Sequence, residues 1–125
     1  MRKTEDVFQV ANKITKKIVL KKNVDFLIVD FHGEITSEKN AIGHQFDGKA
    51  TLVIGTQTHI PTNDARILKN GTAYQTDAGM CGDYDSVIGM NKENSLNRFL
   101  KKNSVKHFPA TGDATLCGVI VDCDI

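Results

Sequence analysis

The 125-residue sequence has no excess of charge of either sign and no long apolar run. Lysine and arginine number 16 and the acidic residues 15, so the formal net charge of +1 gives no reason to expect binding to nucleic acid or to a membrane surface. No apolar stretch approaches the roughly 20 residues that a membrane-spanning helix needs. The first residues, MRKTEDVFQV, lack the apolar segment of a signal peptide. We therefore expect a cytoplasmic protein without nucleic-acid or membrane partners.

Nucleotide-binding fingerprints and paired cysteines are also missing. Neither G-x-G-x-x-G nor a P-loop occurs, and none of Cys81, Cys117 and Cys123 lies in a C-x-x-C motif. An odd number of cysteines without such pairs is typical of reduced thiols in a cytosolic protein. A nucleophilic Cys81 would need a nearby histidine or helix N-terminus to stabilise its thiolate, and the sequence does not show that arrangement.

The length fits a single domain over residues 1–125, because the sequence shows no repeat, low-complexity segment or linker. The first predicted element is a helix over 7–18. Apolar residues recur there on one helical face, and Asp6 can cap the N-terminus. The apolar positions of this face are Val7, Ala11, Ile14 and Ile18.

A β-α-β unit follows. Residues 26–29 form a short, continuously apolar run that is typical of a strand covered on both faces. Thr36 and Ser37 are candidate N-caps of a helix that ends near residue 46, and 50–54 form a second short strand. Strands joined by such a crossover helix are parallel. The helix residues expected to face inward are Ala41, Ile42 and Phe46.

The rest of the chain predicts a hairpin and shorter elements. Asn70-Gly71 is a strong hairpin signal between strands at 65–68 and 72–76, because both residues tolerate positive φ. The remaining predictions are a loop over 79–90, a helix over 92–102 and a strand over 114–122.

Polar side chains stand where both strands of the β-α-β unit end. The carboxyl ends of parallel strands lie at the same edge of a sheet, where open α/β sheets bind ligands. His32 and His59 can therefore converge on one ion, and imidazole suits Zn, Mn or Fe. The alternative is a structural role for each, as we expect for His44 and His107. The first cluster is Asp30, His32 and Glu34, and the second is Thr56, Gln57, Thr58 and His59.

Three stretches of the sequence, together with their spacing, match one family. They are VDFHGEITSEK at 29–39, GTQTHIPT at 55–62 and TAYQTDAGMCGDYDS at 72–86. They resemble the YmdB-like branch of the calcineurin-like metallophosphoesterases, and the interval of 25 residues from position 32 to position 57 is the one that the family pattern has. The resemblance covers nearly the whole chain.

The resemblance implies an α/β fold that is the C-terminal half of a four-layer α/β/β/α metallophosphoesterase sandwich, with the β-α-β unit and the hairpin in it. It implies divalent metal ions (Mn, Fe, Zn or Mg), hydrolysis of a phosphodiester such as a 2′,3′-cyclic nucleotide, and assembly as oligomers. Two such ions together generate the nucleophile and stabilise the phosphate charge. His32 and His59 match metal ligands of the family, and no catalytic residue is assigned in this chain.

The sequence departs from the family pattern in two ways. Gln57 stands where the family has another histidine ligand, and a neutral amide is a weaker donor than imidazole for these ions. The family's other ligands and its catalytic histidine lie in an N-terminal half that precedes the matched residues. We therefore expect a single incomplete domain with uncovered sheet faces, a fragment that is inactive alone. The alternatives are one half of a split enzyme, completed by a separate N-terminal chain, and a non-enzymatic assembly or binding module.

Overall fold

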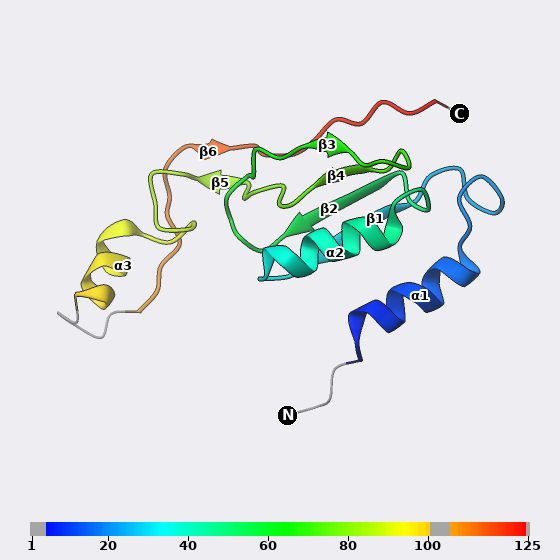
Figure 1. The fold of residues 1–125 in the computed structure, drawn as a ribbon. Coiled ribbons are helices and arrows are strands. Elements are labelled where there is room, and N and C mark those ends of the chain that lie inside the picture. The colour runs from blue at the N-terminus through cyan, green and yellow to red at the C-terminus, as the bar shows by residue number, and fades with distance from the viewer. Residues whose placement is uncertain (1–4, 101–105, 125) are drawn as a thin grey trace.

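The computed structural model describes residues 5–100 and 106–124, which form a mixed α/β fold as predicted. Figure 1 shows α2 against a four-stranded sheet with α1 below it, and α3 away from that sheet, next to a two-stranded one. The elements of the described residues are α1 (Val7–Lys17), β1 (Ile28–His32), α2 (Thr36–Phe46), β2 (Leu52–Thr56), β3 (Arg66–Ile67), β4 (Ala73–Gln75), β5 (Gly82–Asp83), α3 (Lys92–Phe99) and β6 (Ala114–Thr115).

The predicted β-α-β unit is present, and its two strands are parallel. β1 pairs with β2 from Ile28 opposite Leu52 to His32 opposite Thr56. Both strands begin two residues later than predicted, at 28 instead of 26 and at 52 instead of 50. The sheet order is β1-β2-β4-β3, so β1 lies at an edge of the sheet that the described residues form.

The prediction that the first strand is covered on both faces is wrong. Val29 and Phe31 pack against the core, whereas Ile28 is 65% exposed. Side chains alternate along a strand, so Asp30 and His32 share the exposed face with Ile28. The apolar run shows only that the side chains of this strand are hydrophobic. Whether both faces of the strand are covered depends on which other layers pack on the sheet. We call the side of the sheet that carries Ile28, Asp30 and His32 the open face.

The helices α1 and α2 cover the opposite side of the sheet and enclose the core with it. α1 begins as predicted, because the Asp6 carboxylate accepts hydrogen bonds from the amides of Phe8 (2.8 Å) and Gln9 (3.4 Å). The core cluster comprises Ala11, Ile42, Phe46, Ala50, Val53, Leu68 and Tyr74.

α2 has the predicted bounds, but its cap and its inward face differ from the prediction. Its N-cap is Ile35, which makes no side-chain cap hydrogen bond, and Thr36 and Ser37 lie inside the helix. Ala41 is exposed. The buried stripe, which follows the helical repeat, is Lys39, Ile42, Gly43 and Phe46. An amphipathic pattern with a lysine in its buried stripe is hard to orient from the sequence, which explains the error.

The hairpin is confirmed, since β3 and β4 pair antiparallel. Of the two turn residues, Gly71 has a positive φ, of 99°, whereas Asn70 does not. α3 starts at Lys92 as predicted, and the side chain of Asn91 caps it by accepting from the amide of Asn94 at 3.0 Å. The end of the predicted helix, residues 101–102, lies outside the described residues. No helix among the described residues is long and apolar enough to cross a membrane.

The strand predicted over 114–122 is wrong beyond its first two residues. β6 pairs with β5, a short strand inside the predicted loop over 79–90. Residues 119–122 instead pass over the sheet, where they line a cavity of about 310 Å³ with Leu52, Ile67 and Ala73. Ile120 in this segment is 95% exposed. Val119 and Val121 are half-buried on the sheet side, so the segment lies over the sheet without pairing as a strand.

Candidate functional site

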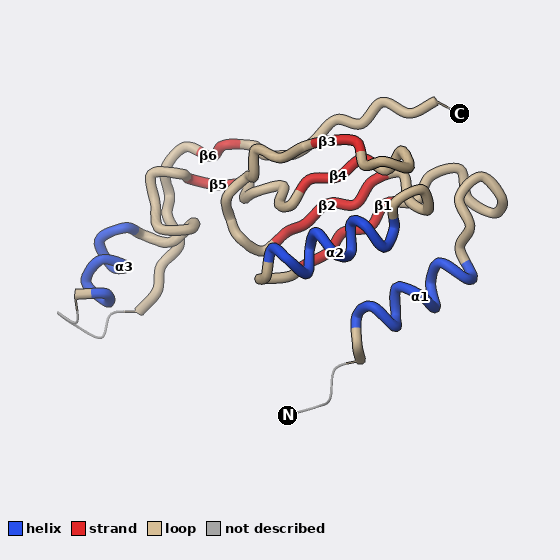
Figure 2. The backbone as a smooth tube through the Cα atoms, viewed as in Figure 1, coloured by secondary structure: helices blue, strands red, loops and turns tan. Residues whose placement is uncertain are grey.

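The candidate site begins where the two parallel strands end. Figure 2 shows loops directly after β1 and β2, at the same edge of the sheet. The pairing of His32 with Thr56 places the first polar cluster beside the start of the second. The expectation that both clusters share one edge is therefore confirmed.

On the open face, Asp30, Thr56 and His32 form a chain of hydrogen bonds. The Thr56 hydroxyl donates to Asp30 Oδ1 over 3.0 Å, and the same Oγ1 lies 3.0 Å from His32 Nδ1. A hydroxyl has one proton, so His32 Nδ1–H donates to Thr56 Oγ1. Nε2 of the neutral ring then carries a lone pair, which is the state that a metal ligand needs.

Gln57 spans the two clusters. Its Nε2 donates to Glu34 Oε2 over 3.1 Å, which joins the loop after β2 to the loop after β1. The bond uses the amide nitrogen, so the amide oxygen, the atom that can ligate a cation, takes no part in it. Gln57 has a φ of 118°, a conformation that non-glycine residues rarely adopt.

His59 is held by the loop that precedes α3. Its Nδ1 lies 3.0 Å from the carbonyl oxygen of Ile88. A carbonyl only accepts, so Nδ1 carries the proton and Nε2 the lone pair in the neutral ring. Ligating histidines in metalloproteins are oriented in this way by carbonyl acceptors. A cavity of about 290 Å³ adjoins the ring and is lined by His59, Ile60, Met80, Tyr84, Ser86, Val87 and Ile88.

A buried ion pair lies behind the second cluster, and the sequence reasoning missed it. Lys39 Nζ is 2.6 Å from Asp77 Oδ2, and the two side chains are 1% and 0% exposed. Burial alone would raise the pKa of Asp77, but hydrogen bonds from Lys39 and from the amides of Thr58 and Gly79 outweigh it and lower that pKa. The available signal was the position of Lys39, three residues before Ile42 and seven before Phe46 in the buried stripe of α2.

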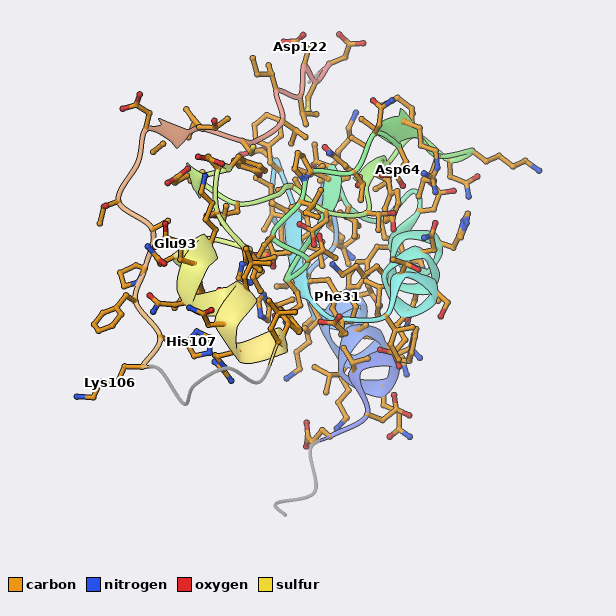
Figure 3. All side chains as sticks on the ribbon, turned by 90° about the vertical axis from the view of Figure 1, so that its left-hand side faces the viewer. Phe31, Asp64, Glu93, Lys106, His107 and Asp122 are labelled. Carbon is orange, nitrogen blue, oxygen red and sulfur yellow. The ribbon has the colours of Figure 1, made fainter. Side chains whose placement is uncertain are left out.

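A second carboxylate, Asp64, orders the turn beside this pair, and Figure 3 labels it. Its Oδ1 accepts from Thr62 Oγ1 at 2.6 Å and from the amide of Thr76 at 3.1 Å, and Arg66 Nη1 donates to its Oδ2 at 2.8 Å. Burial would raise the pKa of Asp64, but these hydrogen bonds hold it well below its usual range.

The residues present fit part of a metal centre. In both His32 and His59 the Nδ1 atom is hydrogen-bonded to an oxygen, which leaves Nε2 as the nitrogen that could bind Zn, Mn or Fe. Over residues 5–100 and 106–124, no group of three or more His, Cys, Asp or Glu side chains is placed to hold an ion. The donor set of the described residues is therefore too small for a metal site, and the assignment of His32, His59 and Gln57 as ligands stays a prediction.

The two other histidines lie apart from the strand ends. His44 is exposed in the last turn of α2. His107 is exposed beside α3 (Figure 3), where it lines a cavity with Ser95, Arg98 and Phe99 that shares Val87 and Ile88 with the cavity beside His59. Neither site involves the loops after β1 and β2.

With this geometry in place, comparison with known proteins decides the family. A sequence model of the YmdB-like protein family matches the chain over residues 1–125. The chain belongs to the YmdB-like family. The resemblance carried by the stretches at 29–39, 55–62 and 72–86 is thereby confirmed.

The YmdB-like chain has relatives named for phosphoester hydrolysis. It is 43% identical over 120 residues to the 2′,3′-cyclic-nucleotide 2′-phosphodiesterase of Bacillus subtilis. It is 47% identical over 122 residues to a candidate phosphatase/phosphodiesterase of Mycoplasma pneumoniae. The alignments cover 96% and 94% of this chain but 45% and 43% of those proteins, so the chain spans less than half the length of these relatives.

Solved structures of similar proteins share the fold. The crystal structure of a hypothetical protein from Thermus thermophilus matches with a TM-score of 0.80 at 41% identity, covering 91% of this chain and 44% of that one. A novel phosphatase from Mycoplasma pneumoniae matches with a TM-score of 0.79 at 42% identity, covering 90% and 39%. The α/β arrangement of this YmdB-like chain is thus also found in part of a solved phosphatase structure.

Proposed function

We propose that these 125 residues supply one side of a metal-dependent phosphodiesterase site and do not hydrolyse phosphodiesters alone. His32 and His59 would be ligands through Nε2, and Gln57 a weak oxygen donor. The observation that carries the proposal is that both histidines stand at one sheet edge with Nδ1 bound to an oxygen acceptor. The name of the Bacillus subtilis relative favours a 2′,3′-cyclic nucleotide as the substrate.

The chemistry of such a site would need more ligands than this chain brings together. A divalent cation in a phosphoesterase neutralises phosphate charge and generates the nucleophile. Since no third ionisable ligand joins the histidines within the described residues, the further ligands would come from a polypeptide segment outside the 125 residues. That segment could belong to a longer form of the same polypeptide or to a separately encoded N-terminal half.

The experiment compares the chain alone with a chimera. In the chimera, residues 1–125 replace the matching 45% of the Bacillus subtilis relative. We expect no turnover of bis-p-nitrophenyl phosphate or 2′,3′-cyclic AMP with Mn²⁺ by the chain alone, even with Gln57→His. We expect turnover by the chimera, a further increase with Gln57→His, and loss with His59→Ala.

The matched control is His44→Ala in the chimera, which removes an exposed histidine in the last turn of α2 and should leave the rate unchanged. Mn²⁺-dependent turnover by the chain alone, abolished by His59→Ala, would overturn the proposal that it needs further ligands. A folded chimera that hydrolyses neither substrate would overturn the phosphodiesterase assignment itself.

A second candidate, an assembly module, is favoured by the open face. Ile28 and Ile67 are 65% and 68% exposed on strands of the same sheet. Exposed apolar side chains of this kind mark surfaces for another protein layer. Light scattering on the isolated chain distinguishes the candidates: a discrete oligomer that binds no Mn²⁺, together with an inactive chimera, would favour the assembly module.

A further inference from the structure

The buried pair of Lys39 and Asp77 is bonded to the backbone on both sides of Gln57. Lys39 Nζ donates to the carbonyl oxygen of Thr56 over 2.8 Å as well as to Asp77. Asp77 Oδ2 accepts from the amide of Thr58 at 3.0 Å, and its Oδ1 accepts from the amide of Gly79 at 2.9 Å. The pair therefore connects α2, the end of β2 and the turn after β4.

The segment held in this way has an unusual backbone. Gln57 has a φ of 118° and His59 a φ of 62°, both in the positive region that disfavours non-glycine residues. Such conformations persist only when the surrounding structure fixes them, and they cluster at functional sites. The bonded atoms, the carbonyl of Thr56 and the amide of Thr58, flank the first of these residues.

Stability alone does not explain an ion pair at this position. Replacing a buried ion pair by apolar side chains of similar volume is often neutral or stabilising. Apolar side chains could not, however, accept from the Thr58 and Gly79 amides or donate to the Thr56 carbonyl. What distinguishes Lys39 and Asp77 from an apolar pair is directional bonding to the loop that carries the candidate ligands.

We propose that Lys39 and Asp77 are positioning residues that hold residues 57–59 so that His59 keeps Nδ1 on the Ile88 carbonyl and presents Nε2 outward. The pair touches neither substrate nor metal in this scheme and acts through the backbone of the loop. The role of the presented nitrogen as a ligand rests on the proposed function, whereas the geometric claim concerns the 125-residue chain alone.

The test reads the tautomer of His59 directly. In the ¹⁵N-labelled chain, long-range ¹H–¹⁵N correlation spectra at a pH where histidines are neutral distinguish Nδ1–H from Nε2–H. We expect the Nδ1–H form to dominate at His59. The double variant Lys39→Met/Asp77→Leu should lower the ratio of Nδ1–H to Nε2–H by about tenfold, equivalent to about 1.4 kcal/mol in orientation, while the chain stays folded. The His44 ring, exposed in the last turn of α2, serves as the internal reference.

The control variant is Asp64→Asn, which weakens hydrogen bonds in the adjacent turn without contacting residues 57–59. It should lower the melting temperature and leave the His59 tautomer unchanged. If the double variant fails to fold, Asp77→Asn keeps the side-chain shape and removes the charge, and a smaller shift in the same direction is expected.

A folded variant of the pair with an unchanged His59 tautomer would overturn the proposal, since the pair would then be purely structural. An equal tautomer change in Asp64→Asn would also overturn it, because the effect would not be specific to the pair. Neither readout needs metal or turnover. If the chimera is inactive, a changed His59 tautomer in the double variant still supports the positioning role. If the chimera is active and the tautomer is unchanged, the positioning role is refuted and the proposed function is not.

Discussion

The two strand ends that form the candidate site are built differently. At the end of β1, Asp30, His32 and Glu34 are all exposed, and their hydrogen bonds run across the surface to Thr56 and Gln57. At the end of β2, residues 56–59 are half-buried and rest on the ion pair of Lys39 and Asp77, which is closed to solvent.

This difference indicates which histidine is preorganised. Buried, fully hydrogen-bonded polar networks rigidify their surroundings, because each unmade bond would leave a desolvated group. Exposed hydrogen bonds compete with water and constrain a side chain much less. The backbone that carries His59 should therefore hold its geometry in the isolated chain, whereas the orientation of His32 would benefit from a layer over the open face.

The largest effect that separates the two ends is expected from two glycines. A Cβ on Gly55, near the end of β2, would lie 1.8 Å from the carbonyl oxygen of Thr76 and 3.1 Å from Lys39 Cδ. A Cβ on Gly33, after β1, would meet the Phe31 ring at 2.9 Å, and a ring edge can shift. We expect Gly55→Ala to lower the free energy of unfolding by about 3 kcal/mol and Gly33→Ala by about 1 kcal/mol, from the usual range for overpacking.

Urea unfolding of both variants at neutral pH measures these two effects. Gly71→Ala is the comparison variant, because Gly71 has a positive φ but an added Cβ would meet nothing within 4 Å. Equal losses for Gly55→Ala and Gly33→Ala would contradict the view that the end of β2 is the more tightly packed.

Acid should act on the β2 side through Asp64. Its pKa is held below the ordinary value of 3.8, so its stabilising contribution is complete above that pH and is lost as the pH falls below it. At pH 7 we expect Asp64→Asn to lower the free energy of unfolding by about 1 kcal/mol. This value is at the low end for hydrogen bonds to a charged group, because the Asp64 side chain is 33% exposed and water screens its charge. The deficit should shrink as the pH falls from 4 to about 2, because the Asp64 carboxylate of the unfolded wild-type chain is protonated in this range while that of the folded chain stays ionised.

Chemical unfolding at several pH values in this range provides the measurement. Asp122→Asn, in the exposed C-terminal segment (Figure 3), is the matched control and should change stability at no pH. A deficit of Asp64→Asn that stays constant down to about pH 2 would mean that its charge contributes nothing.

Local patterns predicted much of the fold, because they depend on neighbours in the sequence. The capped helix at Asp6, the hairpin at Asn70-Gly71 and the parallel β-α-β unit all follow from spacing within a few residues. The covering of β1 and the course of the tail depend on strand order and on layers far away in the chain. Those predictions proved wrong, as did the N-cap and the inward position of Ala41 in α2.

The candidate site shows the same limit. That the two strand ends meet follows from parallel pairing, and so could be predicted. The bond between Lys39 and Asp77 joins residues 38 positions apart, and the acceptor of His59 lies 29 positions away. No local pattern reports such contacts. A lysine in the buried stripe of a helix indicates that a buried carboxylate is needed, but not which one supplies it.

The smallest expected effect tests the β1 side, where Thr56→Val removes the hydroxyl between Asp30 and His32. The exposed hydrogen bonds lost should lower the free energy of unfolding by only about 0.5 kcal/mol. The tautomer of His32 should nevertheless change, because Nδ1 loses its oxygen acceptor and the ring is free to turn on the open face. The long-range ¹H–¹⁵N spectra that report on His59 report on His32 as well.

Thr56→Ser keeps the hydroxyl and should preserve the His32 tautomer. His59 should be unaffected in both variants because its acceptor is the Ile88 carbonyl. If Thr56→Val leaves His32 unchanged, the hydroxyl does not orient that ring, and the β1 end would owe its geometry to the strand alone.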